Sequence, residues 1–150
     1  MNWKSFLLGM LCIALVACGG AVGVGSGAVD NLASTRVKTN SSDAVNKAVL
    51  TVFHEKGFKI LSQRSQSIIF IKAGGRSADI AWSTINNPNP VMIRPTVAWR
   101  STGTGEMILT CQVDVVQRDT SFGETVRQPI MMGKSAYGGM LNDVKRRVER

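Results

Sequence analysis

The stretch that decides the fold lies past the middle of the chain and reads "VMIRPTVAWRSTGTGEMILTCQVDVV", Val91 to Val116. Apolar residues alternate with polar ones on both sides of a glycine-rich turn, which is the pattern of an antiparallel hairpin with one buried face. A turn made of Ser101 to Gly105 would place Trp99 opposite Met107. We therefore expect two paired strands whose apolar residues share a face.

Three kinds of residue in this hairpin have specific consequences. Pro95 has no backbone N–H to donate, so its strand is expected at a sheet edge or with a bulge. Cys111 falls on the apolar face, and we expect a buried thiol, with an intermolecular disulfide or a reactive thiol as the alternative. Trp99, like Trp82 earlier in the chain, is expected in the core, with a place in a ligand site as the alternative.

Shorter strands are expected before the hairpin. They are read at "FKILSQR" (58–64), "SIIFIK" (67–72) and "ADIAW" (78–82). A five-residue turn between the last two would pair Ile68 with Trp82. The register of the first two stays open, because Ile60 could face Ile71 or Lys72.

A helix is expected at each end of this run of strands. Ser41, Ser42 or Asp43 can cap the first helix, and Gly57 can end it. Its apolar stripe is Val45, Val49, Val52 and Phe53, and the stripe of a last helix starting near Ser135 is Tyr137, Leu141, Val144 and Val148. The predicted fold class is α+β, with two layers: an antiparallel meander sheet of four to five strands and both helices packed on one face.

The charge and the rare residue types limit the classes of function. The formal net charge is +8, which favours anionic partners. The single histidine, His54, is expected as a solvated residue of the first helix, and the acidic residues are scattered. We therefore expect no enzyme, no metal site and no cofactor. Nucleic-acid binding would suit the charge, but it does not suit the membrane-surface compartment inferred below and no interleaving of aromatic and basic residues supports it, so no nucleic-acid partner is expected.

The end of the last helix is strongly basic. The four residues are Lys145, Arg146, Arg147 and Arg150. They are interpreted either as a solvated helix end that suits the helix dipole or as a docking patch for an anionic partner.

Residues 1–17 are predicted to be a signal peptide. Lys4 provides a positive charge, and an apolar run from Phe6 to Val16 follows. The run ends in "LVAC", which resembles the lipobox of bacterial lipoproteins. That resemblance implies cleavage between Ala17 and Cys18 and attachment of diacylglyceryl and further acyl chains, commonly palmitate, at Cys18. The alternative is an ordinary secretory signal with a chance cysteine.

Residues 18–40 are expected to be a lipidated, glycine-rich flexible tether, followed by a folded α+β domain at 41–150. The alternative for Gly19, Gly23 and Gly27 is a ladder of small residues that packs helices. Gly19 and Gly20 follow Cys18, and the absence of an aspartate there implies, for a Gram-negative source, the periplasmic face of the outer membrane.

The whole pattern resembles small proteobacterial outer-membrane lipoproteins with a helix-grip-like α-β-α module. The resemblance rests on "AVLTVFHEKGFKIL" (48–61) and "AYGGMLNDVKRRV" (136–148). In pattern only, it extends to the C-component of the outer-membrane β-barrel assembly machinery. It implies a non-enzymatic accessory or adaptor of the cell envelope that contacts an envelope protein. The alternative function is binding of a small ligand, either a lipid, a peptide or a glycan.

Overall fold

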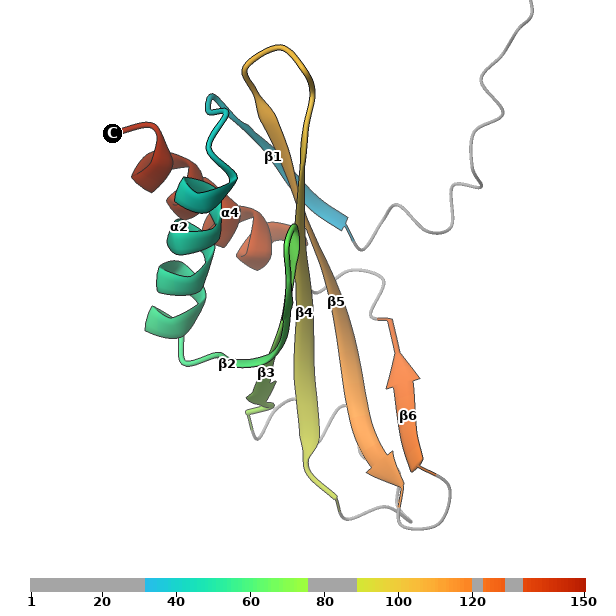
Figure 1. Ribbon diagram of the computed structural model, residues 1–150. Helices are drawn as coiled ribbons and strands as arrows, with labels where there is room; N and C mark the ends of the chain where they lie inside the picture. Colours follow the sequence, from blue (N-terminus) through green and yellow to red (C-terminus); the bar gives the residue numbers. More distant parts are fainter. Residues whose placement is uncertain (1–31, 76–88, 120–122, 129–133) are drawn as a thin grey trace, which may run out of the picture.

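The computed structural model describes residues 32–75, 89–119, 123–128 and 134–150. The elements, in chain order, are β1 (Leu32–Val37), α2 (Ser42–Glu55), β2 (Lys59–Arg64), β3 (Ser67–Ala73), β4 (Val91–Ser101), β5 (Met107–Asp119), β6 (Gly123–Arg127) and α4 (Lys134–Val148) (Figure 1). The expected signal peptide, the lipidation site at Cys18, the glycine ladder and the expected strand at 78–82 with Trp82 lie outside these residues.

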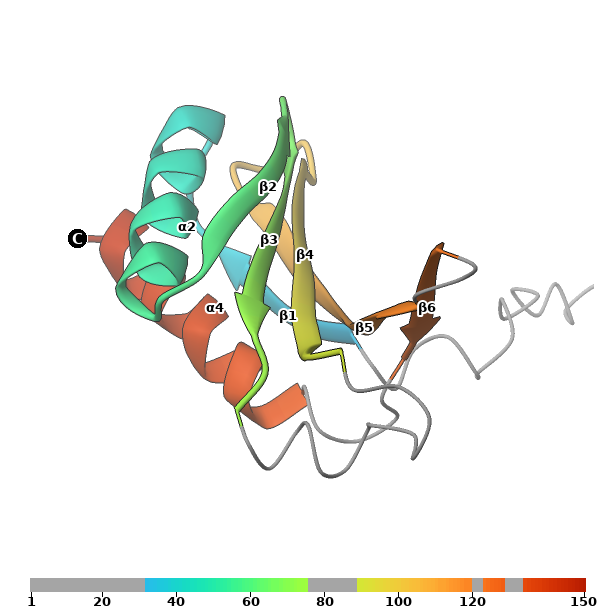
Figure 2. The ribbon, with the colours of Figure 1, turned by 90° about the horizontal axis from the view of Figure 1, so that it is seen from below.

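The described strands form one antiparallel sheet in the order β1-β5-β4-β3-β2. The sixth strand, β6, pairs with the second half of β5, whereas β1 pairs with its first half. Both described helices lie on the same face of the sheet, and no described helix covers the other face (Figure 2). The α+β class and the antiparallel sheet are confirmed, and the sheet has six described strands where four to five were predicted.

The central hairpin forms as predicted, but its register differs. Trp99 lies opposite Leu109, and Ser101 lies opposite Met107, so the predicted pairing of Trp99 with Met107 is wrong. The reason is where the loop closes: the backbone N–H of Thr102 donates a 2.9 Å hydrogen bond to the carbonyl of Glu106, so the loop runs from Thr102 to Glu106 and Ser101 still belongs to the strand. The loop is centred one residue later than predicted, which moves the register by two and leaves the buried face unchanged.

Pro95 lies in an interior strand, because β4 is paired on one side with β5 and on the other with β3. The same register holds on both sides of the proline, from Ile69 opposite Thr96 to Lys72 opposite Ile93. The prediction of an edge strand or a bulge is therefore wrong. The missing N–H is accommodated by an interruption in the β3–β4 ladder, since no pair forms at Pro95 itself.

The pairing of β3 also differs from the prediction. Both of its edges are occupied, by β2 and by β4, and Ile68 lies opposite Val97. The predicted pairing of Ile68 with Trp82 is therefore wrong. Ile60 lies opposite Phe70, which is neither of the two registers that the sequence left open.

Two strands were not expected. β1 lies within the segment predicted to be a tether, so that prediction is wrong for residues 32–37, and the folded unit includes residues before 41. Only Ala33 and Val37 of β1 are buried, which gives a weak pattern in sequence. β6 lies in a segment for which no strand was predicted, and all five of its residues are exposed.

The core lies between the sheet and the two helices. α4 contacts β1 and β5, and α2 lies beside α4. Phe53 of α2 stacks on Phe70 of β3, with ring centroids 4.6 Å apart. The residues of both predicted helical stripes are buried or, for Val148, partly buried against this core. Trp99 is buried too, and its indole N–H donates a 2.8 Å hydrogen bond to Ser42 Oγ, which confirms its expected place in the core.

Candidate functional site

The site begins at the end of α2, where the chain turns into β2. The helix starts as predicted, with Ser41 Oγ accepting a hydrogen bond from the backbone N–H of Ala44. At the other end, Gly57 has φ +81°. The N–H of Gly57 donates to the carbonyl of His54, and the N–H of Phe58 donates to the carbonyl of Phe53. These two bonds form a Schellman motif, which sets the direction in which β2 leaves the helix.

An aromatic contact completes this turn. The rings of Phe58 and Phe53 lie 5.6 Å apart and are tilted by 57°. The ammonium of Lys72 lies 5.4 Å from the centroid of the Phe58 ring and donates a 2.8 Å hydrogen bond to the carbonyl of Lys56. The turn is therefore held by the core on one side and by β3 on the other.

β2 is an edge strand, and all six of its residues are exposed. The pairing with β3 shifts by one residue between Ile60 and Ser62, so six residues of β2 lie opposite five of β3. This bulge at Leu61 interrupts the alternation of faces. As a result Ile60 and Leu61, two adjacent apolar side chains, are 53% and 52% exposed.

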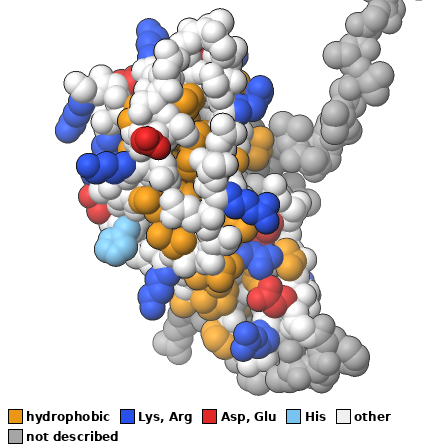
Figure 3. Space-filling view, viewed as in Figure 1, with side chains coloured by type: hydrophobic (Ala, Val, Ile, Leu, Met, Phe, Trp, Pro, Cys, Tyr) orange, Lys and Arg blue, Asp and Glu red, His pale blue; other side chains and the backbone are white. Residues whose placement is uncertain are grey.

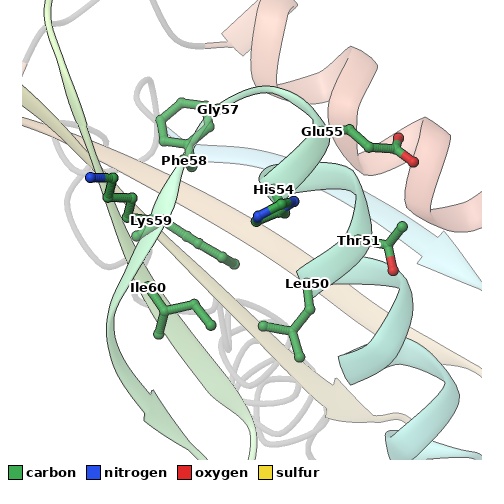
Figure 4. A pocket seen from close by; sticks show the side chains of 9 residues that line it. Leu50, Thr51, His54, Glu55, Gly57, Phe58, Lys59 and Ile60 are labelled. Carbon is green, nitrogen blue, oxygen red and sulfur yellow. The ribbon is translucent and has the colours of Figure 1, made fainter.

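A hollow of about 900 Å3 lies between α2 and β2. Its walls include Leu50 and His54 from α2, Phe58 from the turn and Ile60 from β2, and the buried Phe70 of β3 also lines it. Leu50 and Ile60 point toward each other across the hollow, with His54 above them (Figure 4). We call this hollow the edge groove.

The edge groove is open to solvent and mainly apolar. Hydrophobic side chains gather along the gap between α2 and the neighbouring strands, close to a histidine at its margin (Figure 3). The hydrogen bond from Gln63 Nε2 to Asn46 Oδ1, 3.3 Å long, joins strand and helix one helical turn beyond Leu50. The groove is therefore bounded by this bond and by the turn at Gly57.

Positive charge lies along the outer face of β2. Lys59 and Arg64 are both exposed, and the side chain of Lys59 points away from α2 (Figure 4). β2 itself contains no acidic residue. Among the described residues that line the groove, Glu55 alone has a carboxylate, and it forms an ion pair with Arg147 of α4 at 2.6 Å.

The basic end of α4, predicted as a docking patch or a solvated helix end, is largely neutralised by its own neighbours. Arg146 pairs with Asp143, and Lys145 pairs with Glu149 at 4.0 Å. Arg147 pairs with Glu55, and Arg150 lies beside Arg146 and Arg147 in a separate shallow hollow. The four predicted residues are therefore together in space, but three of the four cations face carboxylates.

The buried thiol was predicted correctly. Cys111 is fully buried and unbonded to another cysteine. Burial raises the pKa of its thiol to about 12, which keeps it protonated and unreactive near neutral pH. Burial, followed by the proximity of Cys111, also raises the pKa of Tyr137 to about 12. His54 is exposed at the end of α2, as expected.

The residues of the edge groove were not predicted as a site. The available signal was the pair Ile60–Leu61, two adjacent apolar residues in an otherwise polar strand. Leu50 gave a second signal, because it lies off the buried stripe of its helix and is only half-buried. Neither signal predicts a groove unless the helix and the strand are known to lie side by side.

No protein-family model and no curated protein matches the chain. In the described part of the chain, no helix has both the length and the apolar character needed to cross a membrane. Among the same residues, no group of three or more histidine, cysteine, aspartate or glutamate side chains is placed to hold a metal ion.

Proposed function

We propose that this chain is a lipid-anchored envelope lipoprotein that faces the periplasm and acts as a non-enzymatic adaptor, binding a partner protein at the edge groove. One observation carries the proposal: an exposed edge strand lies beside an apolar groove on a helix-covered sheet. An exposed sheet edge with a side-chain pocket next to it is one of the recurring ways in which proteins bind extended segments of other proteins.

The anchor in this proposal is Cys18, and it is supported by the "LVAC" segment after a short apolar run. Two or three acyl chains give stable membrane attachment, whereas one chain gives only marginal attachment. The signal peptide 1–17 would be removed, and the chain from Leu32 onward would then carry the adaptor surface. Transfer to the outer membrane in a Gram-negative cell belongs to the same proposal.

The anchor is tested with the variant Cys18→Ser. Palmitate labelling and recovery in the membrane fraction should both be lost, while the folded part keeps its circular dichroism spectrum. Unchanged labelling and full membrane recovery would show that Cys18 is not lipidated.

The adaptor role is tested by cross-linking in cells. A photoreactive residue in place of Ile60, which is half exposed at the groove, should capture a defined envelope protein. The matched control replaces Val126, which is 46% exposed on β6, and should not capture that protein. Equal capture from both positions, or none from either, would contradict a specific surface at the groove.

A second candidate function is supported by the size of the groove. A volume of about 900 Å3 lies within the range of sites for drug-sized ligands, about 300–1,000 Å3. The wall side chains Leu50, Phe58, Ile60 and Phe70 would suit an apolar group such as an acyl chain. Native mass spectrometry of the protein purified from its membrane would detect such a ligand as a defined mass that is lost in Ile60→Glu.

A further inference from the structure

Among the described residues, one side of the β2 backbone has no partner strand. The strand is the last in the sheet order and pairs only with β3 among the described strands. No described residue other than those of β3 forms a backbone hydrogen bond with it. A free edge is a template for one more strand, provided that the side chains of that strand fit the two faces.

The register defines those two faces. Ile60 and Gln63 lie opposite Phe70 and Ile68, which face the helices, so they belong to the groove side. Lys59, Ser62 and Arg64 lie opposite Ile71, Ile69 and Ser67, so they belong to the uncovered side. Because Leu61 is the bulged residue, an added strand meets five positions that alternate between outer and groove sides.

Charge argues against a second copy of this chain as the added strand. In the antiparallel pairing of two β2 strands along their full length, Lys59 of each copy would lie opposite Arg64 of the other. Like charges directly opposite one another destabilise a sheet. The same two cations favour a partner strand with acidic residues at both outer positions.

We propose that β2 takes up an extended, acid-flanked segment of a partner protein as an additional strand, placing apolar side chains of that segment in the edge groove. This inference rests on the proposed adaptor function and adds to it the chemistry of the partner. The recognised pattern is acidic, apolar, polar, apolar, acidic. The acidic residues pair with Lys59 and Arg64, and at least one apolar side chain enters the space between Leu50 and Ile60.

The probe is the labelled peptide Gly-Glu-Val-Thr-Val-Glu-Gly, which has this pattern in either strand direction. Its binding to the purified full-length protein in a non-ionic detergent is followed by fluorescence anisotropy. Two control peptides isolate the contributions. In the first, both glutamates are replaced by lysine. In the second, the backbone nitrogens of the three central residues are methylated, which removes their hydrogen-bond donors and keeps their side chains.

The original peptide should bind saturably, and the lysine peptide should bind at least about tenfold more weakly, because two attractive cross-strand pairs become repulsive. The methylated peptide should lose binding, because strand addition depends on main-chain hydrogen bonds. Equal binding of the original and methylated peptides would overturn the proposal.

Variants of the protein test the same charge pairs by reversing the charges on β2 instead of those on the peptide. The double variant Lys59→Glu with Arg64→Glu should prefer the lysine peptide over the glutamate peptide. The matched control, Arg36→Glu with Arg127→Glu, makes the same change of charge on exposed residues of β1 and β6 and should keep the original preference. Each of these positions is exposed, so the variants are expected to fold, which circular dichroism verifies.

Other occupants of the groove give different results. A dimer in light scattering that dissociates in Ile60→Glu would identify a second copy and overturn the proposal. A co-purified lipid that prevents the peptide from binding would identify a lipid as the occupant and would also overturn the proposal. Loss of peptide binding together with persistent cross-linking at Ile60 would refute strand addition and leave the adaptor function standing, whereas failure of both would refute both.

Discussion

Replacing Phe53 with alanine should lower the free energy of unfolding by about 4 kcal/mol. Phe53 is fully buried, and its ring contacts those of Phe70 and Phe58 at 4.6 and 5.6 Å. Burial of a phenylalanine side chain contributes about 2–3 kcal/mol, and each aromatic pair adds about 0.5–1.5 kcal/mol. Domains are typically stable by only about 5–15 kcal/mol, so the loss is a large share of the total.

The assay is urea unfolding of the full-length protein, monitored by the circular dichroism signal of its helices. The variant Phe53→Leu keeps most of the apolar volume and should lose about 1–1.5 kcal/mol. Ile60→Ala removes a half-exposed side chain and should lose less than about 1 kcal/mol. A loss below about 1.5 kcal/mol for Phe53→Ala would refute the idea that the aromatic cluster joins α2 to the sheet.

Three further predictions concern single sites. Cys111 should resist iodoacetamide at pH 8 in the native state and react with it in urea. Because the pKa of this thiol rises to about 12 on folding, its contribution to stability should be present below about pH 9 and should fall as the pH rises toward 12. Urea unfolding measured at a series of pH values checks this. Gly57→Ala should cost about 1–2 kcal/mol in thermal or urea unfolding, because φ at this position is +81°. Arg147→Ala should change stability by less than about 1 kcal/mol, because its ion pair with Glu55 is half exposed.

The sequence predicts the elements with strong local signals. α2 was placed between its serine cap and Gly57 because capping and left-handed termination depend on residues inside the segment itself. The buried face of the central hairpin was predicted for the same reason. The register of that hairpin was not predicted, because it depends on which residues close the loop. Thr102 and Glu106 close it, whereas Gly103 and Gly105 lie inside the loop in either register.

Elements that depend on distant partners were missed. The paired residues of β1 and β5 lie 70 to 80 positions apart in the chain, and only two side chains of β1 are buried. Pro95 lies in the interior of the sheet because β4 pairs with β3 as well as with β5, and no local sequence pattern indicates the pairing with β3. The edge groove was missed for the same physical reason, because Leu50 and Ile60 form its walls only after the Schellman turn brings helix and strand together.

At the basic end of α4, the sequence predicted more than the structure supports. The sequence groups Lys145, Arg146 and Arg147, and the structure keeps them together. Their charge is nevertheless offset by Asp143, by Glu149 and by Glu55, the last of which lies 92 residues away from Arg147. A run of like charges in sequence therefore overstated the positive charge at that surface.

Amide hydrogen exchange tests the central claim most directly. In the free protein, amides on the open side of β2 should exchange rapidly, because they have no partner among the described residues. Saturation with the peptide Gly-Glu-Val-Thr-Val-Glu-Gly should slow exchange within Lys59–Arg64 by at least about tenfold, and the lysine peptide should not. Unchanged exchange in β2 at saturation, or protection confined to another strand, would contradict the account.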